Sequence, residues 1–257
     1  MDRLAFDEAL QRFRGEQVGA RGGIGTLGEK TVHAVLKHYF CPDPWSQEIK
    51  LSRYVADIVG ESGIIEIQTR GFDKLRRKLA AFLECAAVTV VYPLPRTKWL
   101  VWIEEDTGSV SNKRRSPKTG RPYDALWELY RIKEFLTHPS LRLCIVMLDM
   151  EEYRLLNGYS ADKKKGSTRY ERVPVALADE IWLRSPEDYI QLIPPELPLR
   201  FTSKDYRRAA RMSLSTAQTA LNVLHAVGAV LRVEKQGNTY VYERAFCTPI
   251  PSKSVEM

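Results

Sequence analysis

The chain has 257 residues, of which 44% are hydrophobic and 10% aromatic, a composition that fits a packed globular protein and excludes a disordered one. This length suits one large domain or two modest ones. The formal net charge of +7 favours a polyanionic partner, because basic side chains that neutralise phosphates release condensed counterions.

Three features of the sequence bear on the compartment. Acids interrupt the first ten residues, MDRLAFDEAL, where a secretory signal would carry an apolar run. No stretch approaches the ~20 apolar residues that a membrane-spanning helix needs. The four cysteines lie far apart and form no Cys-x-x-Cys pair, which argues against structural zinc or disulfides. We therefore expect a soluble cytoplasmic protein with free thiols and no membrane partner.

The first predicted elements are two helices followed by three short strands. Apolar residues at helical spacing predict helices at about 3–14 and 26–40, separated by the glycine-rich residues 19–28. The strands are expected at about 46–51, 54–59 and 63–69. The turn Gly60-Glu61-Ser62-Gly63 joins the last two as a hairpin.

Helices and strands continue to alternate after the hairpin. A basic helix at about 72–85 precedes the apolar run 87–92, which is typical of a strand buried on both faces. A strand at 99–104 and a polar loop at 106–121 are expected next. A helix at 122–137 and a strand at 142–149 follow them. This alternation predicts an α/β fold, with a mixed sheet flanked by helices, and residues 157–172 follow as a basic loop.

Prolines mark the expected domain boundary. Residues 193–198 read Ile-Pro-Pro-Glu-Leu-Pro, which is typical of a linker. We therefore divide the chain into four parts. The first domain spans 1–193, with its core at about 25–150, and the linker spans 194–200. The second domain spans 201–246, and the disordered tail spans 247–257.

The residues best suited to chemistry lie in the hairpin YVADIVGESGIIEIQT. Side chains alternate along a strand, so Glu66 and Gln68 point one way while Ile65 and Ile67 point the other. Asp57 lies on the partner strand in a register that can bring it beside Glu66. Neighbouring carboxylates repel each other, and a divalent cation such as Mg²⁺ or Mn²⁺ relieves that repulsion. The backbone carbonyl of Ile67 could add a further oxygen ligand.

These residues resemble the PD-(D/E)XK, or restriction-endonuclease-like, nuclease superfamily over roughly residues 25–92. Glu29 in GTLGEKT matches the acid on the first helix, Asp57 matches the motif aspartate, and Glu66-Ile67-Gln68 matches the (D/E)XK triplet. The resemblance implies a restriction-endonuclease-like mixed sheet and a metal held by Asp57, Glu66 and Glu29. The alternative interpretation is that the two hairpin acids lie exposed on a solvated sheet face.

Gln68 departs from the superfamily pattern, because the usual residue is lysine and glutamine cannot supply a cation or a general base. Some members of the superfamily carry glutamine at this position and remain active. Another cation could compensate: Arg70, Lys78 or Lys74, of which Lys74 is preferred because it lies in the first turn of the following helix. His33, one helical turn after Glu29, could border the site.

Residues 201–243 carry a second pattern. A capped helix at about 203–210, a turn, a second capped helix at about 215–227 and two strands around Gly237-Asn238 follow in that order. This order resembles a winged helix-turn-helix, which implies contact with duplex DNA. The residues expected to contact phosphates or bases are Arg207, Arg208, Arg211, Thr216, Gln218, Thr219, Asn222 and Lys235. A winged helix used for protein contacts is the alternative.

The two resemblances together imply a Mg²⁺-dependent DNA endonuclease whose C-terminal domain positions double-stranded DNA. Cleavage of both strands would favour a homodimer. The same domain order resembles the nuclease subunit of some transposition systems, and restriction, defence and repair are further contexts. The alternative from another class is a DNA-binding regulator with an inactive nuclease-like domain, and RNA cleavage is a third possibility that the second domain disfavours.

Overall fold

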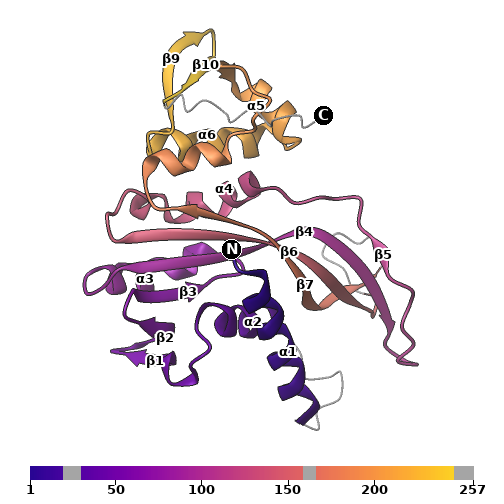
Figure 1. Cartoon of the computed structure of the whole chain (residues 1–257). Coiled ribbons are helices and arrows are strands. Elements are labelled where there is room, and N and C mark those ends of the chain that lie inside the picture. Colours follow the sequence, from indigo (N-terminus) through magenta and orange to yellow (C-terminus); the bar gives the residue numbers. More distant parts are fainter. Residues whose placement is uncertain (20–29, 159–165, 246–257) are drawn as a thin grey trace, which may run out of the picture.

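The computed structural model describes residues 1–19, 30–158 and 166–245, so Glu29, most of the 19–28 segment and the tail after residue 245 lie outside the described residues. The described part is built around a mixed sheet (Figure 1). Its strands are β1 (Gln47–Leu51), β2 (Tyr54–Gly60), β3 (Gly63–Ile67), β4 (Val88–Glu104), β5 (Arg114–Arg115), β6 (Leu141–Leu156) and β7 (Thr168–Leu183). A smaller sheet contains β8 (Arg200–Thr202), β9 (Val230–Gln236) and β10 (Thr239–Arg244).

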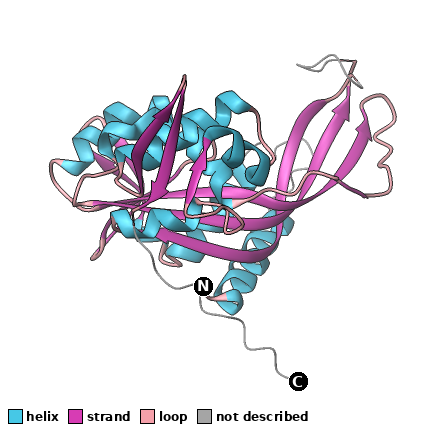
Figure 2. Ribbon diagram, turned by 90° about the horizontal axis from the view of Figure 1, so that it is seen from above, coloured by secondary structure: helices cyan, strands magenta, loops and turns pink. Residues whose placement is uncertain are grey.

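The order in the large sheet is β1-β2-β3-β4-β6-β7, with β5 paired to β4. β3, β4 and β6 run parallel, and the other pairs are antiparallel. The predicted mixed sheet flanked by helices is therefore confirmed. Figure 2 shows that the far ends of the long strands extend beyond the helices.

Helices cover both faces of this sheet, with α1 (Arg3–Gly19) and α2 (Lys30–Phe40) on one face. On the other face lie α3 (Arg76–Leu83), α4 (Leu126–Leu129) and the 3-10 helices η3 (Phe72–Leu75), η4 (Pro122–Ala125) and η5 (Tyr130–Phe135). Two further 3-10 helices are η2 (Pro44–Ser46) and η6 (Pro186–Leu192). Each face has its own apolar core, because every other residue of a strand such as β6 points to the same side.

Four predicted elements differ from the structure. The strands expected at 87–92 and 99–104 are one strand, β4, in which a register shift between Pro95 and Thr97 accommodates the prolines. The helix expected at 122–137 is divided, with non-helical backbone at Ile132. The basic loop is expected to end at residue 172, but β7 already begins at Thr168. The burial pattern of β7 is irregular, and its pairing with β6 contains three register shifts.

The C-terminal segment adds α5 (Ser203–Ala210) and α6 (Leu214–Ala226) to the small sheet, with the predicted caps at Thr202 and Ser213. Figure 1 shows α6 lying along α4. Leu221 of α6 and Leu129 of α4 belong to one continuous buried cluster.

The proline-rich connection is packed. The Arg244 guanidinium donates to the carbonyl oxygens of Pro194 and Leu197, at 3.0 and 2.9 Å. The Tyr206 hydroxyl donates to the Leu192 carbonyl at 2.7 Å. The predicted boundary at 194–200 therefore falls on a hydrogen-bonded turn that runs into β8, and its role as a domain boundary stays a prediction. No helix in residues 1–19, 30–158 or 166–245 is long and apolar enough to cross a membrane.

Candidate functional site

The candidate site is the point where the ladder between β2 and β3 opens. Regular pairing runs from Gly60–Gly63 to Ile58–Ile65, and continued register would place Asp57 opposite Glu66. There the side chains replace the main-chain bonds: the Asp57 N–H donates to Glu66 Oε1 at 3.2 Å, and the Ile67 N–H donates to Asp57 Oδ2 at 2.7 Å. The predicted adjacency of the two carboxylates is confirmed, and neither is an exposed surface acid.

Two helices on opposite faces of the sheet each contribute one basic side chain. His33 of α2 places its Nε2 3.1 Å from Asp57 Oδ2. Lys78 of α3 donates from Nζ to Glu66 Oε2 at 2.5 Å and lies over the Phe82 ring. The carboxylate pair is therefore held between an imidazole and an ammonium group.

The surroundings separate the acidities of the two carboxyls. Burial, followed by the charge of Asp57, raises the pKa of Glu66 to about 7 despite the hydrogen bond from Lys78. Burial also acts to raise the pKa of Asp57, but His33, the Ile67 N–H and Lys78 outweigh it and hold that pKa below its usual value. The surroundings therefore favour the ionised form of Asp57 more strongly than that of Glu66, a difference typical of functional sites.

The donor set suits a hard divalent cation. Asp57 and Glu66 supply carboxylate oxygens. Burial and then the charge of Asp57 raise the pKa of Glu66, and a bound cation would relieve that charge repulsion. The Ile67 N–H faces the open side of the ladder, and its carbonyl faces the same way because both groups of a strand residue point to one side. Among the described residues no group of three or more His, Cys, Asp or Glu side chains is arranged to hold a metal.

The other predicted site residues lie in different places. The Gln68 amide donates to the Arg70 carbonyl rather than to either carboxylate. Lys74 is exposed on η3, and Lys78 occupies the position beside Glu66 that was assigned to Lys74. Lys74 lies in the 3-10 turn of residues 72–75, and Lys78, one helical turn further along in α3, is the lysine that contacts Glu66. Glu29 lies outside the described residues.

The residues expected to contact DNA fall into two groups. Arg207, Arg208, Arg211, Gln218 and Lys235 are exposed. Thr216, Thr219 and Asn222 are only partly exposed. The Thr216 N–H donates to the cap Ser213, Thr219 donates to the Ser215 carbonyl, and Asn222 accepts from Lys133 of η5 at 2.8 Å.

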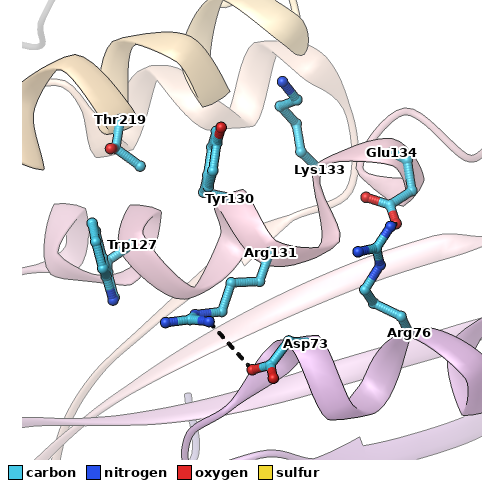
Figure 3. Close-up of a pocket in the computed structure, with 8 residues that line it drawn as sticks. All are labelled: Asp73, Arg76, Trp127, Tyr130, Arg131, Lys133, Glu134 and Thr219. Carbon is cyan, nitrogen blue, oxygen red and sulfur yellow. Dashed lines mark hydrogen bonds and ion pairs between the residues drawn. The ribbon is translucent and has the colours of Figure 1, made fainter.

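The contact between α6 and η5 borders an open pocket of about 480 Å³ (Figure 3). Thr219 of α6 lies at its edge, opposite Trp127 and Tyr130, whose rings are about half exposed. Arg131 lies over the Trp127 ring and is paired with Asp73 across the pocket. One flank of α6 therefore packs against η5 through Asn222, and contact of Thr219 and Asn222 with DNA stays a prediction.

Comparisons with known proteins identify relatives but assign no activity. Residues 30–184 match a family model described as "Domain of unknown function (DUF8091)". An uncharacterized protein of Treponema pallidum (strain Nichols) is 30% identical over 228 residues, which cover 86% of this chain and 87% of that protein. No solved structure matches the chain. The family match includes β2, β3, α3 and the carboxylate pair.

Proposed function

The chain belongs to the DUF8091 family, and because that membership names no chemistry, we propose from the site itself that it is a metal-dependent DNA endonuclease. The observation that carries this proposal is the opened ladder, where Asp57 and Glu66 are held side by side and each is contacted by one basic side chain. A sheet that served only as scaffold would not gain from two adjoining, largely buried acids, because their repulsion destabilises the fold.

The proposed metal is Mg²⁺ or Mn²⁺, held by Asp57, Glu66 and the Ile67 carbonyl, with Glu29 as a further ligand that the superfamily resemblance implies. When bound, such an ion activates water and stabilises charge on a phosphate. We assign to Lys78 the cationic role that Gln68 cannot fill, because its ammonium group already contacts Glu66. His33 holds Asp57 ionised and fixes its orientation.

The fold supports the same proposal at a coarser level. A mixed sheet with helices on both faces, and carboxylates on adjoining strands, is compatible with a restriction-endonuclease-like core. The order β8-α5-α6-β9-β10 is compatible with a winged helix. Exposed Arg207, Arg208 and Arg211 supply positive charge for a DNA backbone. Duplex DNA is therefore the proposed substrate, and a homodimer is the proposed arrangement for cutting both strands.

Incubation with supercoiled plasmid and Mg²⁺ or Mn²⁺ tests the proposal. We expect nicked or linear product from the wild type and none above background from Asp57→Asn or Glu66→Gln. Glu61→Gln is the matched control, because Glu61 lies in the same hairpin but is exposed at its tip. Cleavage that survives in Asp57→Asn, or no metal-dependent cleavage of any DNA form, would refute the proposal. An RNA substrate in the same assay tests ribonuclease activity.

The second candidate function is a DNA-binding regulator with an inactive site. The observation that favours it is the Gln68 amide, which is bound to the Arg70 carbonyl and leaves the third motif position without a group at the carboxylates. Binding of duplex DNA without cleavage, and without change in Asp57→Asn, would support this candidate over the endonuclease.

A further inference from the structure

A second cluster of charged residues lies on the extended part of the large sheet. Glu152 of β6 is 1% exposed, yet basic side chains surround its carboxylate. Lys98, Arg154 and Arg172 each place a nitrogen 3.1 Å from a Glu152 oxygen, and Arg169 approaches to 3.7 Å. These residues come from β4, β6 and β7, with Arg172 directly opposite Glu152 in the register.

Among the ion pairs of the described residues, several cations converge on Glu152. Lys98, Arg154 and Arg172 alone set three cations against one carboxylate. Burial, together with Arg172, acts to lower the pKa of Lys98, while Glu152 opposes that shift. Neighbouring cations in a partly dry site repel each other, and an additional anion relieves that repulsion. An anion that enters beside the cluster would therefore be attracted by these cations.

An open pocket lies directly beside the cluster. Its volume is about 400 Å³, and its lining combines three arginines and one acid with smaller polar side chains and a tyrosine: Arg70, Arg154, Arg169, Glu171, Ser167, Thr168 and Tyr170. Arg70 and Arg169 are exposed, whereas Ser167 is buried and is contacted by the Arg154 guanidinium. Guanidinium groups in a concave site match the oxygens of a phosphate.

Two connections join this pocket to the carboxylate site. Arg70 lies two residues after Gln68, and its backbone carbonyl accepts a hydrogen bond from the Gln68 side-chain amide. On the other side, Thr31 of α2 donates to Glu171 of the pocket lining, and His33, two residues later on α2, contacts Asp57. The pocket and the carboxylate site are therefore linked through α2 and through the segment that follows β3.

We propose that the pocket formed by Arg70, Arg154 and Arg169 binds a backbone phosphate of the DNA strand that occupies the carboxylate site. This inference rests on the proposed function for its choice of anion, and it names the part of the substrate that the pocket takes. The contact is independent of base sequence, because phosphates carry no sequence information.

Fluorescence anisotropy with a labelled duplex in metal-free buffer, over a series of salt concentrations, tests this proposal. The variants are Arg70→Gln, Arg169→Gln and the double variant. Arg53→Gln is the matched control, because Arg53 is an exposed arginine at the β1–β2 turn. We expect the double variant to bind roughly tenfold more weakly, with the slope of log K against log salt reduced by about 0.9 for each lost phosphate contact.

The outcomes separate this inference from the endonuclease proposal. Unchanged affinity and salt slope in the double variant overturn the phosphate pocket, even if the wild type cuts DNA through Asp57. Pocket-dependent binding without metal-dependent cleavage supports the pocket and removes the nuclease. A wild type that binds no duplex DNA overturns both. Thermal melts confirm that each variant is folded, and the single variants decide whether Arg70 or Arg169 carries the effect.

Discussion

At the scale of single residues, Lys78 is the side chain on which the proposed chemistry depends. It pairs with Glu66 from α3, while Lys74, four residues earlier, is exposed. We expect Lys78→Met to lower the single-turnover rate of plasmid nicking by roughly 100-fold or more, the usual cost of losing one positioned charge at a reacting phosphate. Lys74→Met should leave the rate within about twofold, since a solvated lysine adds little. Equal rates for the two variants would contradict this assignment.

Glu171 gives a prediction about pH that does not depend on catalysis. Burial raises its pKa to about 7, and the Thr31 hydroxyl only partly opposes this shift. The folded state therefore binds a proton that the unfolded chain, with an ordinary pKa near 4.5, has released. Stability from this group is fully present below about pH 4.5 and is lost as the pH rises through 7.

Glu171→Gln should remove this pH-dependent loss of unfolding free energy, which is on the order of 2 kcal/mol. The amide oxygen of the new glutamine can still accept the hydrogen bond from Thr31. Urea unfolding at pH 5 and pH 8 measures the effect, and the wild type should weaken more than the variant over this interval. The pKa of Glu66 is also raised, but Glu66 is present in both the wild type and the variant. The difference between their pH dependences therefore reports on Glu171 alone. Equal pH dependence in both proteins would contradict the prediction.

At the scale of elements, the hairpin that carries the carboxylates depends on the glycine at the start of β3. Gly63 has a φ of +109°, and a Cβ there would lie 2.2 Å from the Ala87 carbonyl oxygen, which accepts the Ile64 N–H. We expect Gly63→Ala to destabilise the fold by about 2 kcal/mol or more. Gly60→Ala is the matched control, because no atom lies within 4 Å of its Cβ position. Comparable urea midpoints for the two variants would refute this expectation.

The helix α6 has two kinds of polar residue, and they should respond differently to substitution. Asn222 accepts from Lys133, so Asn222→Ala should cost about 1 kcal/mol of unfolding free energy with little change in DNA affinity. Gln218 is exposed, so Gln218→Ala should leave stability within about 0.5 kcal/mol and weaken binding to duplex DNA. Urea unfolding and fluorescence anisotropy with duplex DNA, measured on both variants, test these two predictions. If Asn222→Ala weakened DNA binding and Gln218→Ala did not, the DNA would lie on the side of α6 that carries Asn222.

At the scale of the whole molecule, the two sheets share one core, so we expect a single cooperative unfolding transition. Leu221 is fully buried in the cluster that also contains Leu129 and Ile132. All five tryptophans precede residue 194, so their fluorescence reports on unfolding of the first part of the chain, and Trp127 also borders α6. Leu221→Ala should lower the midpoint seen by tryptophan fluorescence, at a cost of about 3 kcal/mol. An unchanged tryptophan midpoint would show that the C-terminal segment unfolds independently.

Much of the local structure was predictable from the sequence, because it depends on neighbours along the chain. The turn at residues 60–63 and the alternation of Ile65, Glu66 and Ile67 suffice to place Asp57 beside Glu66. The caps Thr202 and Ser213 likewise hydrogen-bond within one helical turn.

Only the tertiary structure decided which residues complete the site. His33 and Lys78 reach the carboxylates from helices on opposite faces of the sheet, and no local spacing encodes that meeting. Lys74 and Lys78 are four residues apart, a spacing that shares one side of a helix, so only the position of α3 along the sheet decides that Lys78 meets Glu66.

The sequence by itself determined the alternation of helices and strands, the basic charge and the carboxylate pair, since these follow from composition and short-range geometry. The tertiary structure decided three other features: the continuity of β4 through its prolines, the shared core beneath α6, and the basic cluster around Glu152. Each of these depends on contacts between segments far apart in the chain, whose free energy comes from burial and charge pairing that single-segment patterns do not contain.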